Sequence, residues 1–169
     1  MTRLALFAGL TFLVAGLLAG CTQVDEPQPA PQATLTAGAS QTPAAADLPV
    51  VTVYKTPTCG CCEGWVEHLQ ANGFTVETVD INNLTEIKDR YGVPKTLTSC
   101  HTGIVGDYVV EGHVPAEDVK RLLAEAPEGV AGIAVGGMPE GSPGMEGPNP
   151  QPYDVIAFGT EDQSVFARH

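Results

Sequence analysis

The chain has 169 residues, 43% of them hydrophobic, so it can bury one modest core but hardly two. Acidic residues number 20 against 8 lysines and arginines, which gives a formal net charge of −12. This balance argues against nucleic-acid binding, because that function needs clustered Lys and Arg to neutralise phosphates. An acidic surface is compatible with cation binding but does not specify it.

The chain opens on a segment with the layout of an export signal. Arg3 precedes an apolar stretch from Leu4 to about Leu18, shorter than the roughly 20 residues that a membrane-spanning helix needs. We therefore predict a signal peptide over residues 1–20. The ending LLAGC resembles the lipobox of bacterial lipoproteins, which implies that Cys21 is lipidated and becomes the first mature residue. An ordinary signal peptide is the alternative, and both predict an extracytoplasmic protein. If Cys21 is lipidated, the protein meets the membrane only through this lipid anchor.

Residues 21–48 are rich in Pro, Ala, Gln, Thr and Ser and have no hydrophobic period. Such a segment cannot bury enough surface to offset its ordering entropy, so we expect a disordered tether. A domain follows over residues 49–147, and residues 148–169 form a C-terminal extension.

Hydrophobic patterns in the domain predict alternating strands and helices. PVVTVYK predicts a strand, and the helical spacing of Trp65, Val66 and Leu69 predicts a helix after it. FTVETVDI and NLTEIKDRYGV predict a second strand and a short helix. KTLTSCHTGIVGDYVVEGHV predicts two strands separated by glycines, and PAEDVKRLLAEAP predicts a helix that begins at Pro115. The expected order is therefore β-α-β-α-β-β-α.

The chain after this helix contains one short apolar strand and a loop of Gly, Pro and Met. The segments YDVIAF and SVFAR then predict a hairpin. We expect this part to pack on or beside the main sheet and to bring its loop to the cysteines.

This order, with cysteines between the first strand and the first helix, resembles the thioredoxin-like fold over about residues 49–127. The resemblance implies an α/β domain with a central mixed sheet and flanking helices. Thioredoxin-like proteins usually carry a proline before the third strand, facing the cysteines. Pro94 is the nearest candidate, so we expect Cys100, on the following strand, to approach the cluster.

Three cysteines, Cys59, Cys61 and Cys62, fall within four positions where the first helix begins. The positive end of the helix dipole stabilises a thiolate, which is both a nucleophile and a metal ligand. Cys59 and Cys62 have the C-x-x-C spacing of a redox dithiol. Cys61 between them would compromise clean disulfide exchange, and the crowding also fits poorly with two structural disulfides, a further alternative.

With Cys100 as a fourth donor, the cluster suits a soft cation. Zinc accepts four thiolates but usually takes them from two separate C-x-x-C turns. Cu(I) prefers thiolate and thioether ligands and shares bridging sulfurs, so the spacing favours a multinuclear copper cluster over zinc.

Further candidate donors lie near the cysteines in the sequence. His101 follows Cys100 and would help to stabilise Cu(II), while Met138 and Met145 offer thioethers on the glycine-rich loop. Packing of that loop on a hydrophobic patch explains the two methionines equally well. We expect His113 at the surface or in a turn, and a structural role for His68.

Three separated motifs together resemble the CopG-type copper-resistance family, long filed as a domain of unknown function: YKTPTCGCCEGWVEHLQANGF, GVPKTLTSCHTGIVGDYVVEGHVPAEDV and GIAVGGMPEGSPGME. The resemblance covers about residues 50–147. It implies a periplasmic protein that binds a cysteine-bridged multinuclear copper cluster, with redox activity between Cu(I) and Cu(II). It also implies cluster ligands at four cysteines and a secondary site at two methionines, namely Cys59, Cys61, Cys62 and Cys100, with Met138 and Met145.

We therefore expect a lipid-anchored, extracytoplasmic protein of copper resistance that binds copper ions and works beside other copper-handling proteins. A thiol–disulfide oxidoreductase using Cys59 and Cys62 is the first alternative. The Trp-Cys-x-x-Cys arrangement of thioredoxin is absent, since Trp65 follows the cysteines. A metallochaperone that transfers copper without redox change is the second alternative.

Overall fold

The computed structural model describes residues 48–160 and 162–169. The predicted signal peptide, the lipidation site at Cys21 and the tether up to residue 47 lie outside these residues. Within the described part of the chain, no helix is long and apolar enough to cross a membrane.

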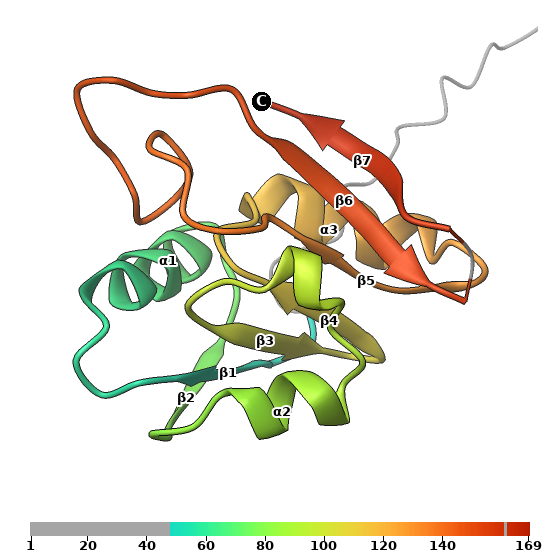
Figure 1. Cartoon of the computed structure of the whole chain (residues 1–169), viewed down its shortest axis with the longest axis horizontal. Coiled ribbons are helices and arrows are strands. Elements are labelled where there is room, and N and C mark those ends of the chain that lie inside the picture. The colour runs from blue at the N-terminus through green and yellow to red at the C-terminus, as the bar shows by residue number, and fades with distance from the viewer. Residues whose placement is uncertain (1–47, 161) are drawn as a thin grey trace, which may run out of the picture. The chain divides into compact units, whose positions relative to one another are not determined.

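The described residues form seven strands, three α-helices and one 3-10 helix (Figure 1). The predicted order is confirmed, and the C-terminal part adds three more strands. The elements are β1 Val51–Lys55, α1 Gly60–Ala71, β2 Val76–Asp80, α2 Thr85–Arg90, the 3-10 helix η2 Lys95–Leu97, β3 Thr102–Val105, β4 Tyr108–Glu111, α3 Ala116–Glu125, β5 Val130–Ala134, β6 Asp154–Gly159 and β7 Ser164–Arg168.

All seven strands join one mixed sheet in the order β2-β1-β3-β4-β5-β6-β7. The β1–β2 and β4–β5 pairs are parallel, and the other four neighbouring pairs are antiparallel. The connection from β3 to β4 is a tight turn, where Gly106 adopts a φ of +55°. This hairpin pairs Thr102 with Glu111, so the residues just beyond its open end face each other.

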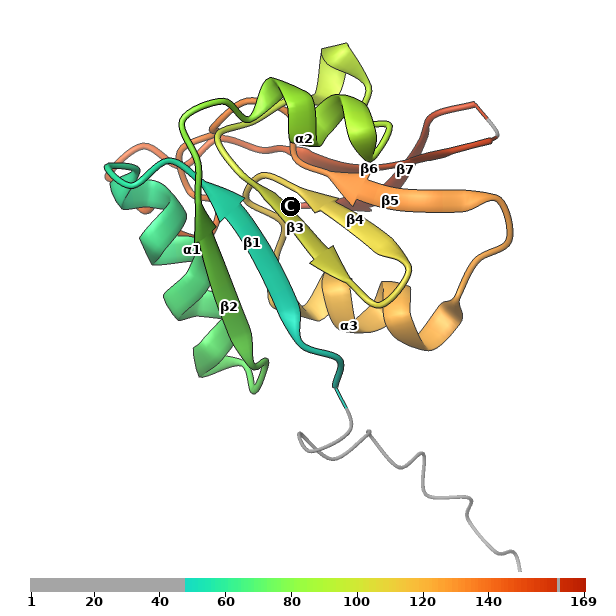
Figure 2. The same cartoon turned by 90° about the horizontal axis from the view of Figure 1, so that it is seen from below.

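The main core lies between the sheet and the helices α1 and α3. Alternate residues of β1, Val51 and Val53, are fully buried and meet Trp65 and Leu69 of α1. Burial of such side chains stabilises each by about 1.5–3 kcal/mol, which explains why both helices dock on this face. Figure 2 shows α2 on the opposite side of the sheet, where Phe158, Val109 and Leu97 belong to a smaller core.

The C-terminal extension continues the sheet instead of forming a separate unit. Strand β6 pairs with β5, and β7 pairs with β6 as the predicted hairpin. Val155 and Ala157 join the main core, and Arg121 of α3 places its guanidinium 3.8 Å from the ring centroid of Phe166 in β7. The expectation that this part packs beside the main sheet is confirmed.

Candidate metal centre

The N-terminal end of α1 places three cysteines at one edge of the core. Cys59 is the N-cap residue, and Cys61 and Cys62 lie in the first turn. Trp65, one turn later, anchors the helix because its ring is fully buried and its Nε1 donates to the carbonyl of Val114 at 2.8 Å. The cysteines therefore sit on a fixed helix end, where the dipole favours thiolates.

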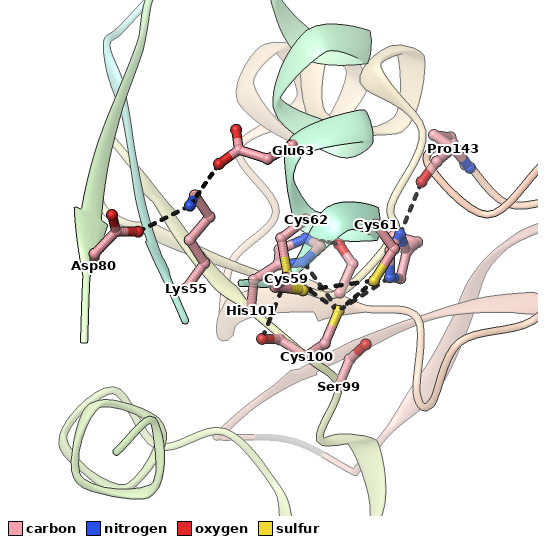
Figure 3. Close-up of a disulfide and its surroundings, with 12 residues drawn as sticks. Lys55, Cys59, Cys61, Cys62, Glu63, Asp80, Ser99, Cys100, His101 and Pro143 are labelled. Carbon is pink, nitrogen blue, oxygen red and sulfur yellow. Dashed lines mark hydrogen bonds and ion pairs between the residues drawn. A yellow bond between two sulfur atoms is a disulfide. The ribbon is translucent and has the colours of Figure 1, made fainter. Parts of the chain in front are cut away.

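Cys100 brings a fourth sulfur to the same place, and the four Sγ atoms all lie within 4.8 Å of one another (Figure 3). The Cys61 Sγ lies 3.5 Å from that of Cys59 and 3.6 Å from that of Cys100. The Cys62 Sγ lies 3.5 Å from that of Cys100. The structure thus brings together the four cysteines that the sequence predicted as neighbours.

Two of these cysteines are joined, because Cys59 and Cys62 form a disulfide with their Cα atoms 5.3 Å apart. In the described residues, Cys61 and Cys100 are free. The sequence interpretation placed little weight on a disulfide, because a third thiol stands between the partners. The structure differs because an N-cap residue and the residue three positions later lie on one side of the helix end, within disulfide range. Cys61 remains free beside the disulfide.

A buried polar network holds the segment that carries Cys100. Glu111, with no exposed surface, accepts from the backbone N–H of Ser99 at 2.6 Å and from the Nζ of Lys88 at 2.5 Å. Its other oxygen accepts from the hydroxyl of Thr102 at 2.7 Å. Cys100 therefore lies in a tethered bend just before β3, and the expectation that it lies on a strand is wrong.

His101 is fully buried beside Cys100, with its Nδ1 3.3 Å from the Cys100 Sγ. Its Nε2 lies 3.0 Å from the carbonyl oxygen of Gly112. A carbonyl only accepts, so Nε2 carries the proton and the lone pair of Nδ1 faces the sulfur. Burial, helped by the neighbouring His113, lowers the pKa of His101 to about 3, so the ring is neutral at pH 7. Trp65 packs against it with ring centroids 4.4 Å apart.

His113 is the residue that sequence reasoning missed. We expected it at the surface or in a turn, but it is fully buried and its Nε2 lies 3.1 Å from the Cys100 Sγ. Its Nδ1 donates to the carbonyl of Pro143 at 2.8 Å, which leaves the lone pair on Nε2. Burial lowers the pKa of His113 as well. The tight β3–β4 turn was the sequence signal that could have placed His113 near Cys100. The hairpin pairs Thr102 with Glu111, so the segments just before β3 and just after β4 lie next to each other.

Cys100 therefore faces two imidazole lone pairs, and the donor atoms of Cys100, His101 and His113 lie within 4.8 Å of one another. Burial and the adjacent Cys61 thiol raise the pKa of Cys100 to about 12, so this sulfur keeps its proton in the absence of a cation. A soft metal ion could replace that proton and be bound by sulfur and neutral nitrogen together. Once the Cys59–Cys62 disulfide is reduced, the arrangement offers four sulfurs and two nitrogens as ligands.

The glycine-rich loop reaches the site through its backbone. Pro143 provides the acceptor for His113, and the Cα of Gly144 lies against Gly64 in α1. The side chain of Met138 is 54% exposed, and that of Met145 is half-buried. The loop therefore approaches the cysteines as expected, while the role of the two thioethers as ligands stays a prediction.

Two charged or titratable side chains near the cluster have structural partners. The Nζ of Lys55 is buried and bridges Glu63 at 2.6 Å and Asp80 at 2.8 Å, which ties the end of β1 to the first turn of α1 (Figure 3). The Nε2 of His68 accepts from the backbone N–H of Ala116 at 3.0 Å, at the start of α3. His68 therefore has the structural role that we predicted.

A mixed sheet flanked by helices, with a cysteine and histidine cluster at the N-terminal end of its first helix, defines a thioredoxin-like protein able to bind metal. Two solved structures match the fold of this chain. One is described as copper resistance protein copG, form 1, and matches with a TM-score of 0.68, 40% identity, and coverage of 73% of this chain and 98% of that one. Form 2 matches with a TM-score of 0.66, 42% identity, and coverage of 72% and 98%.

The chain belongs to the CopG family of copper-resistance proteins, as the sequence motifs indicated. The family described as "Protein of unknown function, DUF411" matches residues 97–145, from the end of η2 through the glycine-rich loop that carries Met138 and Met145. No functionally curated protein matches the chain. The predicted α/β, thioredoxin-like fold is confirmed.

Proposed function

We propose that this copper-resistance protein binds copper as cargo, in a multinuclear cluster bridged by the thiolates of Cys59, Cys61, Cys62 and Cys100. The observation that carries the proposal is the approach of all four Sγ atoms to within 4.8 Å. Sulfurs at such separations can bridge several Cu(I) ions, and Cu(I) is preferred because zinc usually takes its four thiolates from two separate C-x-x-C turns. The full set of four thiolates requires reduction of the Cys59–Cys62 disulfide.

The two buried histidines support copper binding in both oxidation states. The lone pairs of His101 Nδ1 and His113 Nε2 face Cys100, and imidazole nitrogen is a ligand that Cu(II) accepts readily. Low pKa values keep both rings neutral, so neither has to lose a proton before it binds a cation. Cycling between Cu(I) and Cu(II) at this mixed sulfur and nitrogen site is part of the proposal.

The cellular setting of the proposal rests on the sequence. The export signal and the lipobox-like ending before Cys21 support an extracytoplasmic, periplasmic protein held by a lipid anchor. Met138 and Met145 are proposed as a secondary copper site, because thioethers on a loop that touches α1 suit Cu(I). Other copper-handling proteins are the proposed partners.

Copper stoichiometry tests the proposal. The full chain in detergent is reduced, freed of reductant and titrated anaerobically with Cu(I) against a coloured Cu(I) chelator. We expect more than one tightly bound copper per chain, and a lower number for Cys61→Ser. Cys21→Ser is the matched control, because residue 21 lies outside the proposed cluster, and it should leave the number unchanged. Less than one copper per chain, or an unchanged number for Cys61→Ser, would contradict a bridged cluster.

The Cys59–Cys62 disulfide favours a second candidate function, thiol–disulfide exchange with another protein. Cys59 is partly exposed and Cys62 is buried, an arrangement that lets a partner thiol reach one sulfur only. This candidate predicts reduction of an insulin-type disulfide substrate by the reduced chain, with activity retained in Cys61→Ser and Cys100→Ser. Loss of activity in either variant would count against it.

A further inference from the structure

We infer that Cys59 and Cys62 act as a built-in two-electron donor that reduces two Cu(II) ions to Cu(I). The disulfide in the structure is then the oxidised product of this step. The inference rests on the proposed function, since it takes the copper bound at this cluster as its substrate. It goes further by naming the source of the electrons and by dividing the four cysteines into two pairs with different roles.

The geometry separates these pairs. Cys59 and Cys62 close into a disulfide at the end of α1, with Cα atoms 5.3 Å apart and the helix intact from Gly60. Cys61 and Cys100 stay free with their Sγ atoms 3.6 Å apart. With Cys59 and Cys62 oxidised to a disulfide, Cys61 and Cys100 therefore remain free and adjacent to it.

Donors remain for copper after the disulfide has formed. The Sγ of Cys100 lies 3.3 Å from the Nδ1 of His101 and 3.1 Å from the Nε2 of His113. Their ring positions are fixed by the carbonyls of Gly112 and Pro143. Two sulfurs and two neutral nitrogens thus stay available for Cu(I), which prefers soft ligands and tolerates low coordination.

The step balances without another reactant. The thiolates of Cys59 and Cys62 each give one electron to a Cu(II) ion, and one S–S bond forms between them. Two Cu(II) become two Cu(I), and the protons lost when the thiols ionise pass to solvent. The N-terminal position on α1 favours the thiolates that begin this step.

The difference in exposure between Cys59 and Cys62 determines how a dithiol protein would reduce their disulfide again. Cys59 is partly exposed, whereas Cys62 has no exposed surface. One thiolate of the dithiol attacks the Cys59 sulfur and releases the Cys62 thiolate. The second thiol of the dithiol protein then attacks that protein's first sulfur, which is joined to Cys59 in the mixed disulfide. This attack frees Cys59 and leaves the dithiol protein with a disulfide of its own.

The test uses the full chain with Cys21→Ser, so that four thiols remain, reduced and kept anaerobic in detergent. Two equivalents of Cu(II) are added, and the Cu(II) signal is followed by electron paramagnetic resonance. After an acid quench, Cu(I) is measured with a chelator, and the remaining thiols are alkylated and located by fragment mass spectrometry. We expect two Cu(I) per chain and the loss of two thiols. Cys61 and Cys100 should be alkylated, whereas Cys59 and Cys62 should not.

Two variants test the role of the Cys59–Cys62 pair. His68→Gln, the matched control because its side chain bonds to Ala116 and not to a cysteine, should still yield two Cu(I) and the same disulfide. Cys62→Ser should slow the loss of the Cu(II) signal at least tenfold, because the preformed partner of Cys59 is missing. The inference would be overturned by persistence of all four thiols, by an oxidised pair containing Cys61 or Cys100, or by an unchanged rate in Cys62→Ser. A chain that binds several Cu(I) yet keeps its four thiols after Cu(II) would overturn this inference and leave the proposed function standing.

Discussion

The Cα of Gly144 lies against Gly64, so close that a Cβ on Gly64 would be 2.9 Å from it. Through this contact, the glycine-rich loop that carries Met138 and Met145 packs on the first turns of α1, next to the cysteines. The residue before Gly144, Pro143, then supplies the carbonyl that fixes the ring of His113. Two glycines far apart in the sequence therefore set the orientation of an imidazole at the candidate metal centre.

Gly144→Ala should displace the loop from α1. Gly144 has a φ of +79°, and a Cβ there would lie 2.5 Å from the carbonyl oxygen of Cys61. We expect a loss of about 1–3 kcal/mol in the free energy of unfolding, together with weaker copper binding, because His113 loses its acceptor. Urea unfolding and a Cu(I) competition titration measure the two effects.

Gly92→Ala is the control for this variant. Gly92 also has a positive φ, +68°, but its added Cβ would meet nothing within 4 Å. It should lose about 1 kcal/mol of stability and keep its copper affinity. Equal copper affinities for the two variants would show that the contact between the glycines does not matter to the site.

His113→Ala should weaken Cu(I) binding at least tenfold, about 1.4 kcal/mol, because it removes the nitrogen that lies 3.1 Å from the Cys100 Sγ. His68→Gln provides the comparison, since His68 bonds to Ala116 and not to a cysteine. That change should cost stability only. The competition titration checks both, and an unaltered affinity in His113→Ala would remove this residue from the proposed ligands.

The metal-free, reduced protein should lose stability as the pH falls from 6.5 toward 4.5. The pKa of His101 is lowered to about 3 by burial, so the unfolded chain binds a proton over this range that the folded chain does not. The stabilisation is complete above pH 6.5 and is lost on the way down to about pH 3. His101 alone should contribute about 1.4 kcal/mol per pH unit, or roughly 3 kcal/mol over this interval.

Urea unfolding at several pH values measures this dependence, and His101→Asn isolates its source. In this variant, the slope of the unfolding free energy against pH should fall by about 1.4 kcal/mol per pH unit, the contribution of one proton. A slope identical to that of the wild-type chain would mean that His101 is not buried as a neutral ring.

Lys88→Met should destabilise the protein by about 3–5 kcal/mol, because Glu111 would keep a buried carboxylate without its cation. The double variant Lys88→Met/Glu111→Leu should recover part of this loss. A double-mutant cycle by urea unfolding measures the coupling. Additive losses in the cycle would contradict a direct interaction between the two side chains.

The sequence predicted the fold well because its signals are local. The alternation around Val51 and Val53 and the helical spacing of Trp65 and Leu69 depend on short-range patterns that burial enforces. The predicted C-terminal hairpin also formed, but its union with β5 in one sheet could not be derived. That pairing depends on which sheet edge is open, a property of the whole fold.

The candidate site was predictable only in part. Three cysteines in one helical turn must lie together, whereas the burial of His113 depends on Pro143, thirty residues later, as its partner. The presence of Cys61 as a competing thiol argued against the Cys59–Cys62 disulfide, but the structure keeps Cys61 free with its Sγ 3.5 Å from that of Cys59. Contacts between distant segments therefore decide the ligand set, and composition and spacing carry little information about them.

Copper K-edge X-ray absorption of the reduced, anaerobically Cu(I)-loaded chain tests the thiolate-bridged cluster most directly. Our account predicts a first shell dominated by sulfur together with a copper–copper scattering feature, and loss of that feature in Cys61→Ser. A spectrum of isolated copper ions, with no copper–copper scattering at full loading, would contradict it.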